Sequence, residues 1–483
     1  MIINNQQTFI RYNIIDDHNE EQQNNIIIIK IESESNSSCI KIKMLILRKS
    51  VILLVILCIL CIYTITLESR SINSDEKNTS DSKSNRNGRA FTRFQRNTSR
   101  LLNKRSQSKN CANSTHTFES LPVPAGKNLE LVHIVFRHGA RTPADTYPND
   151  PHINETFKPY GWGQVTNLGK CKLYNTGEWL RTRYNSLLGP YYFPDLVHAQ
   201  STGVSRTQMS IQIVLAGLFK PKSTPMEWNK KLNWQPIPVN YEELNKDTLL
   251  LVRIPCPRYG ENFDEIMNEN ENIKDLMERS AELYKNLTEI TGLEIKTPDD
   301  VSSLYSTLKA EKEYGLTLPK WTMDYFPDKM QENAELSYNF NIYTKEMQKI
   351  KSGPFIKKMS NEWKAKRDNT LSPSTRKLYI YCGHDSSIVN FLYALGVWKT
   401  QFPGYSVMAI FELYSTTEGD YEVRIYQKDE GENPIPLTIP GCTEYCPLDK
   451  FLELTADIIP EDGLTEECKA KDPNYVPPPL GGP

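Results

Sequence analysis

Residues 129–143, LELVHIVFRHGARTP, form the stretch that decides the fold. The first eight residues are an apolar, β-rich run, and the polar segment RHGARTP follows at once. An apolar run that ends this abruptly predicts a buried strand followed by a loop. Residues 168–188 then have helical spacing, which lets Leu173, Trp179 and Leu180 share one face.

The strand and helix pattern continues along the chain. Further segments predict strands at 195–202 and 376–382, helices at 204–219 and 383–398, and a terminal strand pair at 407–415 and 421–428. Such alternation is typical of a parallel sheet with covered faces. Residues from about 220 to 370 are charged and lack clear strands, so we expect a largely helical insertion there. The predicted fold is α/β, with a mixed, mostly parallel sheet flanked by helices and a smaller helical insertion domain.

The N-terminal quarter of the chain has a different composition. Residues 51–67, VILLVILCILCIYTITL, form an uncharged apolar run preceded by four basic residues. This pattern predicts a signal peptide or a somewhat short membrane anchor, with its basic flank on the cytoplasmic side. We therefore expect the rest of the chain to enter the secretory pathway, either anchored to the membrane with its folded part lumenal or extracellular, or released as a secreted or lysosomal protein.

Composition divides the chain into five predicted parts. Met44 opens a segment that resembles the start of a secretory signal, so we interpret the stretch before it as a disordered or non-native extension. The residues after the apolar run are rich in Ser, Asn, Lys, Arg and Thr, which predicts a disordered stem. The parts are the extension at 1–43, the signal peptide or anchor at 44–67, the stem at 68–127, the folded domain at 128–470 and a tail at 471–483.

Charge and cysteine content narrow the class of protein. The net charge of -2 argues against a nucleic-acid binder, because such domains usually carry a clustered basic excess. Seven cysteines follow the apolar run, and the oxidising lumen permits disulfides there. Possible N-glycosylation sequons lie at Asn78, Asn97, Asn113, Asn154 and Asn286.

Three segments share one layout, in which a polar cluster follows an apolar strand. The clusters are Arg137 to Arg141, Ser201 to Arg206, and Gly383 to Asp385. Ligand crevices in open α/β sheets form at the carboxyl ends of strands, so we expect the clusters to meet. Together they supply three arginines, two histidines and one carboxylate.

These residue types suit a phosphate monoester. Arginine forks pair with phosphate oxygens, a neutral imidazole can take the phosphoryl group, and a carboxylic acid can protonate the leaving alkoxide. A single histidine after a strand is more often structural, and the convergence of three clusters is what favours a catalytic site. A protonated acid and an unprotonated nucleophile predict activity weighted to acidic pH.

The motifs RHGARTP and GHD resemble the two signatures of the histidine acid phosphatases, a branch of the phosphoglycerate mutase-like superfamily. The likeness to the prostatic and lysosomal type, and to insect venom acid phosphatases, covers roughly residues 128 to 470. Segments that carry it include GWGQVTNLGK, STGVSRTQMS, WQPIPV, PCPRY and PGCTEYCPLDKF. A set of this kind in this order is far more specific than one motif.

The resemblance implies an acid phosphatase, a phosphoric monoester hydrolase that works through a phosphohistidine intermediate on small phosphate monoesters or phosphoproteins. It implies no cofactor and no metal, and family members are often homodimers. The implied roles are nucleophile for His138, proton donor for Asp385, and phosphate ligands for Arg137, Arg141, Arg206 and His384. It also implies disulfides between Cys256 and Cys468 and between Cys442 and Cys446. This leaves Cys171 and Cys382 as expected free, buried thiols.

Two other functions stay open at this point. An inositol polyphosphate phosphatase or phytase of the same superfamily would need additional basic residues around the pocket. A catalytically dead binding protein would commonly have lost the nucleophile or the acid, and this chain retains both His138 and Asp385. Ala140, Gln200 and Gly203 depart from residues frequent in the family, so substrate preference does not follow from the resemblance.

Overall fold

The computed structural model describes residues 10–13, 28–31 and 123–477. The chain splits into two compact units, Met1–Leu101 and Leu102–Pro483. In the first unit, β1 (Ile10–Asn13) pairs antiparallel with β2 (Ile28–Ile31). The predicted apolar segment at 51–67, the stem up to residue 122 and the sequons at Asn78, Asn97 and Asn113 lie outside the described residues. Within the described part, no helix is long and apolar enough to cross a bilayer.

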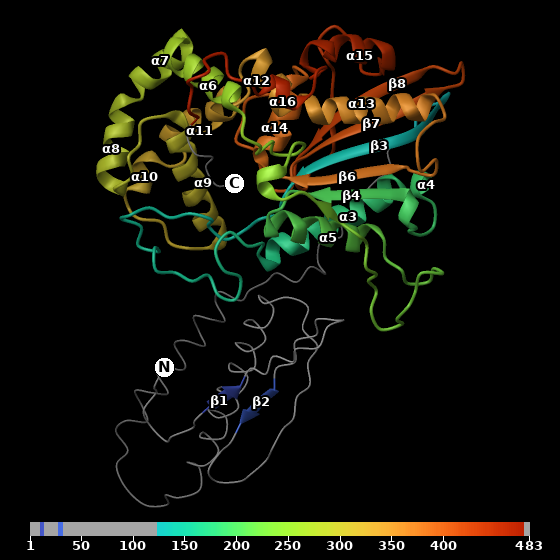
Figure 1. Ribbon diagram of the computed structural model, residues 1–483, viewed down its shortest axis with the longest axis horizontal. Helices are drawn as coiled ribbons and strands as arrows, with labels where there is room; N and C mark the ends of the chain where they lie inside the picture. The colour runs from blue at the N-terminus through green and yellow to red at the C-terminus, as the bar shows by residue number, and fades with distance from the viewer. Residues whose placement is uncertain (1–9, 14–27, 32–122, 478–483) are drawn as a thin grey trace, which may run out of the picture. The chain divides into compact units, whose positions relative to one another are not determined.

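A mixed eight-stranded sheet is the centre of the second unit (Figure 1). Its strands are β3 (Lys127–Arg137), β4 (Val197–Ser201), β5 (Asn240–Tyr241), β6 (Leu378–Gly383), β7 (Met408–Thr416), β8 (Tyr421–Lys428), β9 (Ile435–Leu437) and β10 (Cys446–Pro447). The order is β10-β8-β7-β3-β6-β4-β5, and β9 also pairs with β8. Strands β3, β6, β4 and β5 are parallel neighbours, and β7 to β10 add antiparallel pairs on the other side of β3.

From Leu131 to Phe136, strand β3 is apolar except at His133, because both of its faces are covered there. Leu131 and Val135 pack with α13 (Gly353–Arg367), α14 (Asp385–Ala394) and α15 (Leu448–Thr455) on one face. Val132, Ile134 and Phe136 pack with α3 (Asn167–Arg183) and α5 (Ser205–Leu218) on the other. Alternate side chains of a strand point to opposite faces, so a doubly covered strand reads as a continuous apolar run.

Two glycines allow α3 and α5 to approach closely. A Cβ added at Gly177 would lie 2.1 Å from the backbone oxygen of Val214, and one at Gly217 would lie 2.3 Å from that of Tyr174. Both distances are far below van der Waals contact, so only glycine fits at either position. The contact fixes the two helices that cover one face of the sheet.

A helical region lies between β5 and β6 in the sequence. Its helices are α6 (Pro257–Glu269), α7 (Glu271–Arg279), α8 (Ala281–Thr291), α9 (Pro298–Tyr314), α10 (Thr322–Tyr325), α11 (Asp328–Phe340) and α12 (Lys345–Lys351). They bury two apolar clusters of their own. Helix α13 also falls in the predicted insertion at 220–370, but its buried residues belong to the core of the sheet. The short helices α4 (Asn185–Leu188) and α16 (Leu464–Glu467) lie outside this region.

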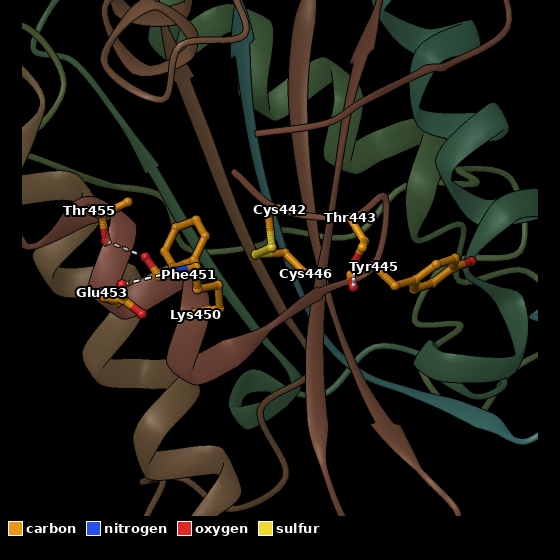
Figure 2. Close-up of a disulfide and its surroundings, with 8 residues drawn as sticks. All are labelled: Cys442, Thr443, Tyr445, Cys446, Lys450, Phe451, Glu453 and Thr455. Atoms are coloured by element: carbon orange, nitrogen blue, oxygen red, sulfur yellow. Dashed lines mark hydrogen bonds and ion pairs between the residues drawn. A yellow bond between two sulfur atoms is a disulfide. The ribbon is translucent and has the colours of Figure 1, made fainter. Parts of the chain in front are cut away.

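Two disulfides join the cysteine pairs that the family resemblance implies. Cys256 bonds to Cys468 across a sequence separation of 212, and Cys442 bonds to Cys446 in the turn that leads into α15 (Figure 2). Cys382 is a buried free cysteine, as expected. The expectation for Cys171 is wrong, because this residue is half-buried and disulfide-bonded. That expectation followed from elimination alone, and an accessible thiol in an oxidising compartment readily finds a partner.

Candidate active site

The three polar clusters of the sequence meet at one edge of the sheet. The last residue of β3, Arg137, is in register with Gly383 at the end of β6. Ser201 at the end of β4 is in register with Cys382 of β6. The backbone N–H of His138 donates to the carbonyl oxygen of Gly383 at 3.1 Å, which joins the first cluster to the third. The parallel pairing therefore places the three carboxyl ends side by side.

His138 is buried, with 2% of its surface exposed. Its Nδ1 lies 3.0 Å from the carbonyl oxygen of Gly139. A carbonyl only accepts hydrogen bonds, so we assign the proton to Nδ1, which leaves a lone pair on Nε2. Burial holds the pKa of His138 well below its usual value, and the positive charges of Arg206 and Arg137 lower it further. The ring is therefore neutral and can act as a nucleophile through Nε2.

Three arginines surround the edge where His138 lies. Arg137 and Arg206 are 2% and 7% exposed. The Nε atoms of Arg137, Arg141 and Arg206 are buried without a hydrogen-bond partner within residues 123–477. Burial, followed by repulsion from Arg141, lowers the pKa of Arg206 to about 10. Buried donors without partners are rare in folded proteins, so this group of cations is suited to an anion with several oxygen acceptors.

Asp385 is the first residue of α14 and faces Arg137. Its Oδ2 lies 2.7 Å from Nη2 of Arg137, and its Oδ1 accepts from the backbone N–H of Ser386 at 2.8 Å. Burial raises the pKa of Asp385, but the charge of Arg137, with smaller contributions from His384 and the backbone N–H of Ser386, outweighs burial and brings it to about 2. Without substrate, Asp385 is therefore a carboxylate at mildly acidic pH.

His384 is engaged through both ring nitrogens. Its Nε2 lies 3.0 Å from Oγ1 of Thr202, and its Nδ1 lies 3.3 Å from Nη2 of Arg206. Arginine can only donate, so Nδ1 is the acceptor and Nε2 carries the proton. The ring centroids of His384 and His138 are 5.5 Å apart. Direct contact between His384 and a phosphate therefore requires Arg206 to leave Nδ1.

Three other histidines of the folded domain lie away from this group. His133 is fully buried in β3 and hydrogen-bonds to Glu362 at 2.7 Å, and His198 on β4 interacts with Gln200. His152 lies in the loop after β3, where its Nε2 is 3.0 Å from the carbonyl oxygen of Thr317. None of the three belongs to the group around His138.

Comparison with known proteins agrees with this geometry. The model of the histidine phosphatase superfamily (branch 2) matches residues 128–427. The chain belongs to this superfamily. The prediction of a histidine phosphatase fold is thereby confirmed.

Several relatives of this histidine phosphatase are acid phosphatases. Prostatic acid phosphatase of Rattus norvegicus is 37% identical over 347 residues, which cover 70% of this chain and 89% of the relative. Venom acid phosphatase of Apis mellifera is 35% identical (71% and 88% covered), and lysosomal acid phosphatase of Homo sapiens is 33% identical (72% and 82% covered). The apo form of Hafnia alvei phytase superposes with a TM-score of 0.56 at 17% identity, over 72% of this chain and all of that one. This likeness shows that the two proteins share a fold.

The structure adds residues to the site of this histidine phosphatase that sequence patterns missed. The loop before β7 supplies the carbonyl oxygen of Pro403, which accepts from Arg137 at 2.5 Å, and the ring of Tyr405, 4.6 Å from the Arg137 guanidinium. Helix α11 supplies Tyr338, whose pKa is raised well above its usual value by burial and then by the charge of the neighbouring Asp385. Tyr405 lies in a loop and Tyr338 lies on a helix. Neither follows a predicted strand, so no sequence pattern pointed to them.

A cleft with a volume of about 740 Å³ opens above these residues. His138, Arg206 and Asp385 line its inner end, and helices α6, α9, α11 and α12 supply other walls. The helical region therefore covers the edge of the sheet and shapes the space available to a leaving group.

Proposed function

We propose that this chain is an acid phosphatase that hydrolyses phosphate monoesters, with His138 as nucleophile and Asp385 as proton donor. One observation carries the proposal: the neutral Nε2 of a buried histidine lies among three arginines whose buried Nε donors have no partner. Family membership and the acid phosphatase relatives support the same reaction.

The first half of the reaction forms a phosphohistidine. Arg137, Arg141 and Arg206 bind the phosphate oxygens and hold the ester in line with Nε2 of His138. Nε2 attacks phosphorus, the bond from phosphorus to the ester oxygen breaks, and the leaving oxygen takes a proton from Asp385. In the second half, water attacks phosphorus, the phosphorus–nitrogen bond breaks, and Asp385 receives the proton of the water. Asp385 passes this proton to the phosphate, which leaves as the monoanion, and both residues return to their starting states.

The proton on Asp385 arrives with the substrate. The carboxyl is ionised before binding because its pKa is about 2. A phosphate monoester with a second pKa of about 6 binds at acidic pH as a monoanion that carries a proton. The anion also offsets the charge of Arg137, which is the main group that lowers the pKa of Asp385. Acidic pH thus favours activity through the substrate, while His138 stays neutral.

His384 and Tyr338 assist at this stage. Once Arg206 turns toward the phosphate, Nδ1 of His384 loses its donor. The nearby anion favours protonation of Nδ1, and the protonated ring can then donate to a phosphate oxygen. The hydroxyl of Tyr338 lies near Asp385 and can donate to its carboxylate.

We infer that the enzyme works in the lumen of the secretory pathway or outside the cell. The two disulfides require an oxidising compartment to form and persist. Asn154 is exposed, so its sequon is accessible for glycosylation. Asn286 on α8 is half-buried, so its sequon is partly accessible. We propose that residues 51–67 anchor the enzyme to the membrane.

Hydrolysis of p-nitrophenyl phosphate by the full chain across a pH series tests the proposed function. We expect activity to be highest at acidic pH, to be lost in His138→Ala, and to fall strongly in Asp385→Asn. Asn keeps the shape of the carboxyl and cannot donate the proton as an acid does. A folded wild-type protein that hydrolyses no monoester, or a His138→Ala variant with full activity, would refute the proposal.

A further inference from the structure

A chain of buried side chains links the loop between β4 and α5 to His384. Thr202 follows the last residue of β4, and Thr207 is the third residue of α5. Both threonines are 0% exposed, and His384 is 3% exposed. Oγ1 of Thr202 lies 3.0 Å from Nε2 of His384 and 2.8 Å from Oγ1 of Thr207. The segment that supplies Arg206 to the phosphate site therefore also contacts the second histidine of that site.

The direction of every hydrogen bond in this chain follows from its far end. Oγ1 of Thr207 donates to the carbonyl oxygen of Val204 at 2.7 Å or to that of Thr202 at 3.1 Å. A carbonyl only accepts, so the single hydroxyl proton of Thr207 is used in this bond. Toward Thr202, Oγ1 of Thr207 is therefore the acceptor, and the hydroxyl proton of Thr202 is used in turn. Thr202 can then only accept from His384, so the proton of the neutral ring lies on Nε2.

Nδ1 of His384 is thereby left as an acceptor when no substrate is bound. It accepts from Nη2 of Arg206 at 3.3 Å, and an arginine can only donate, so both sides of the ring require the same tautomer. The opposite tautomer would place two donors against each other at Nδ1 and two acceptors against each other at Nε2. Unpaired polar groups of this kind are costly inside a protein. The two threonines therefore select one tautomer of His384.

Charged groups from several elements act on His384. Burial holds the pKa of His384 well below its usual value, and the charge of Arg206 lowers it further. Arg137 on β3 and Arg253 in the loop before α6 act in the same direction, whereas Asp385 opposes them. The neutral ring of the nucleophile faces it at a centroid distance of 5.5 Å. A bound phosphate offsets the charge of Arg206 and favours protonation of the ring, and the second proton goes to Nδ1 because Nε2 already has one.

We propose that Thr202 and Thr207 are positioning residues, which hold a proton on Nε2 of His384 so that Nδ1 is available to the bound phosphate. With substrate present, Nδ1 takes a proton from the acidic solvent and donates it to a phosphate oxygen, while Thr202 still accepts from Nε2. This contact requires a protonated ring, so its contribution is largest at acidic pH. The inference rests on the proposed phosphatase function and extends it to two residues that act through His384.

Replacement of the threonines by residues of similar shape tests this role. Thr202→Val removes the acceptor of Nε2, whereas Thr202→Ser keeps the hydroxyl. Thr455→Val is the control, because Thr455 on α15 is 2% exposed and donates to the carbonyl oxygen of Phe451 at 2.9 Å, outside the cleft.

Two measurements on each full-length protein separate binding from turnover. One is kcat/KM with p-nitrophenyl phosphate at about pH 5 and about pH 7, on either side of the usual histidine pKa of about 6.5. The other is the affinity for inorganic phosphate, measured by isothermal titration calorimetry at the same two pH values. Thr207→Val provides a second test of the chain, because it frees the hydroxyl proton of Thr202 to meet Nε2.

We expect Thr202→Val to lower kcat/KM and phosphate affinity by about 10- to 100-fold at the lower pH, the scale of one charge-assisted hydrogen bond. Both losses should be much smaller at the higher pH, where His384 contributes little. Thr207→Val should show a smaller loss with the same pH dependence, and Thr202→Ser and Thr455→Val should match the wild type.

Equal losses at both pH values in Thr202→Val, no loss at either, or the same losses in Thr202→Ser or Thr455→Val would overturn the proposal. If Thr202→Val does not fold, a Thr207→Val variant without a pH-dependent loss would overturn it. A wild type that binds phosphate and does not hydrolyse p-nitrophenyl phosphate would instead refute the phosphatase function, and calorimetry would still decide the role of the threonines.

Discussion

Glu311 on α9 is a buried carboxyl that keeps its proton in the folded protein. Retaining this proton should lower the free energy of unfolding as the pH rises toward neutral. It is 1% exposed, and its Oε2 has no hydrogen-bond partner within residues 123–477. Asp150, which is 3% exposed in the loop after β3, lies close enough for its charge to act on Glu311. Asp150 already accepts from the hydroxyl of Thr146 at 2.5 Å and the backbone N–H of His152 at 2.6 Å. Glu311 must therefore be the protonated member of this pair. Burial, followed by the charge of Asp150, raises the pKa of Glu311 from 4.5 to about 8.

The sign of the pH effect follows from this raised pKa. Between pH 4.5 and about 8, the unfolded chain releases the proton of Glu311 and the folded protein retains it. The free energy of unfolding therefore falls as pH rises through this window. The full shift corresponds to at most about 5 kcal/mol, at 1.36 kcal/mol for each pKa unit.

Glu311→Gln replaces the protonated acid with a neutral group of the same shape. We expect the variant to match the wild type near pH 4.5 and to be more stable by about 2 to 5 kcal/mol near pH 8. Urea unfolding of the full chain, followed by circular dichroism at both pH values, measures the difference. Glu289→Gln on the exposed side of α8 is the control. A Gln variant that is destabilised equally at both pH values, or a difference that does not change with pH, would refute the reasoning.

Three further substitutions test other parts of the structure. Tyr338→Phe removes the hydroxyl near Asp385, so we expect a changed pH–rate profile for p-nitrophenyl phosphate with an unchanged urea midpoint. An unaltered profile would argue against a role for this hydroxyl. Replacing both Cys256 and Cys468 with Ser opens a long loop, and chain entropy predicts a loss of about 5 kcal/mol in the free energy of unfolding. Urea unfolding measures this loss, and a value below about 1 kcal/mol would contradict the prediction. Gly177→Ala places a methyl group against the backbone of α5, and we expect a loss of about 1 to 3 kcal/mol and a lower Tm by calorimetry, whereas an unchanged Tm would mean that the helices separate freely.

Strand-end clusters were the part of the site that the sequence could predict. The apolar run of β3 and the polar residues after it are local features, and parallel pairing follows from the alternation of strands and helices. The structure brings Arg137, His138, Arg206 and Asp385 together at one edge, as this pattern requires. The roles of these residues in catalysis stay predictions until the variants are measured.

Other features depend on contacts between distant segments and leave no local pattern. Tyr338, Arg253 and Lys351 reach the cleft from the helical region and its loops, where their spacing resembles that of ordinary surface residues. The low pKa of Asp385, the first residue of α14, results from Arg137 on β3, so the sequence suggested an acid that is protonated at rest. Cys171 was expected to be a free thiol only because the family motifs left it without a partner, and it is disulfide-bonded. The pairing of a cysteine depends on its surroundings in the fold, which a motif does not show.

The central claim is that His138 carries the phosphoryl group, and trapping the intermediate tests it most directly. Wild-type protein and His138→Ala would be mixed with radiolabelled p-nitrophenyl phosphate at acidic pH, quenched rapidly in alkali, digested and sequenced by mass spectrometry. We predict one phosphoryl group, stable in alkali and labile in acid, on the peptide that contains His138, and none in the variant. A wild-type protein that turns over substrate without this adduct, or with the phosphoryl group on another residue, would contradict the account.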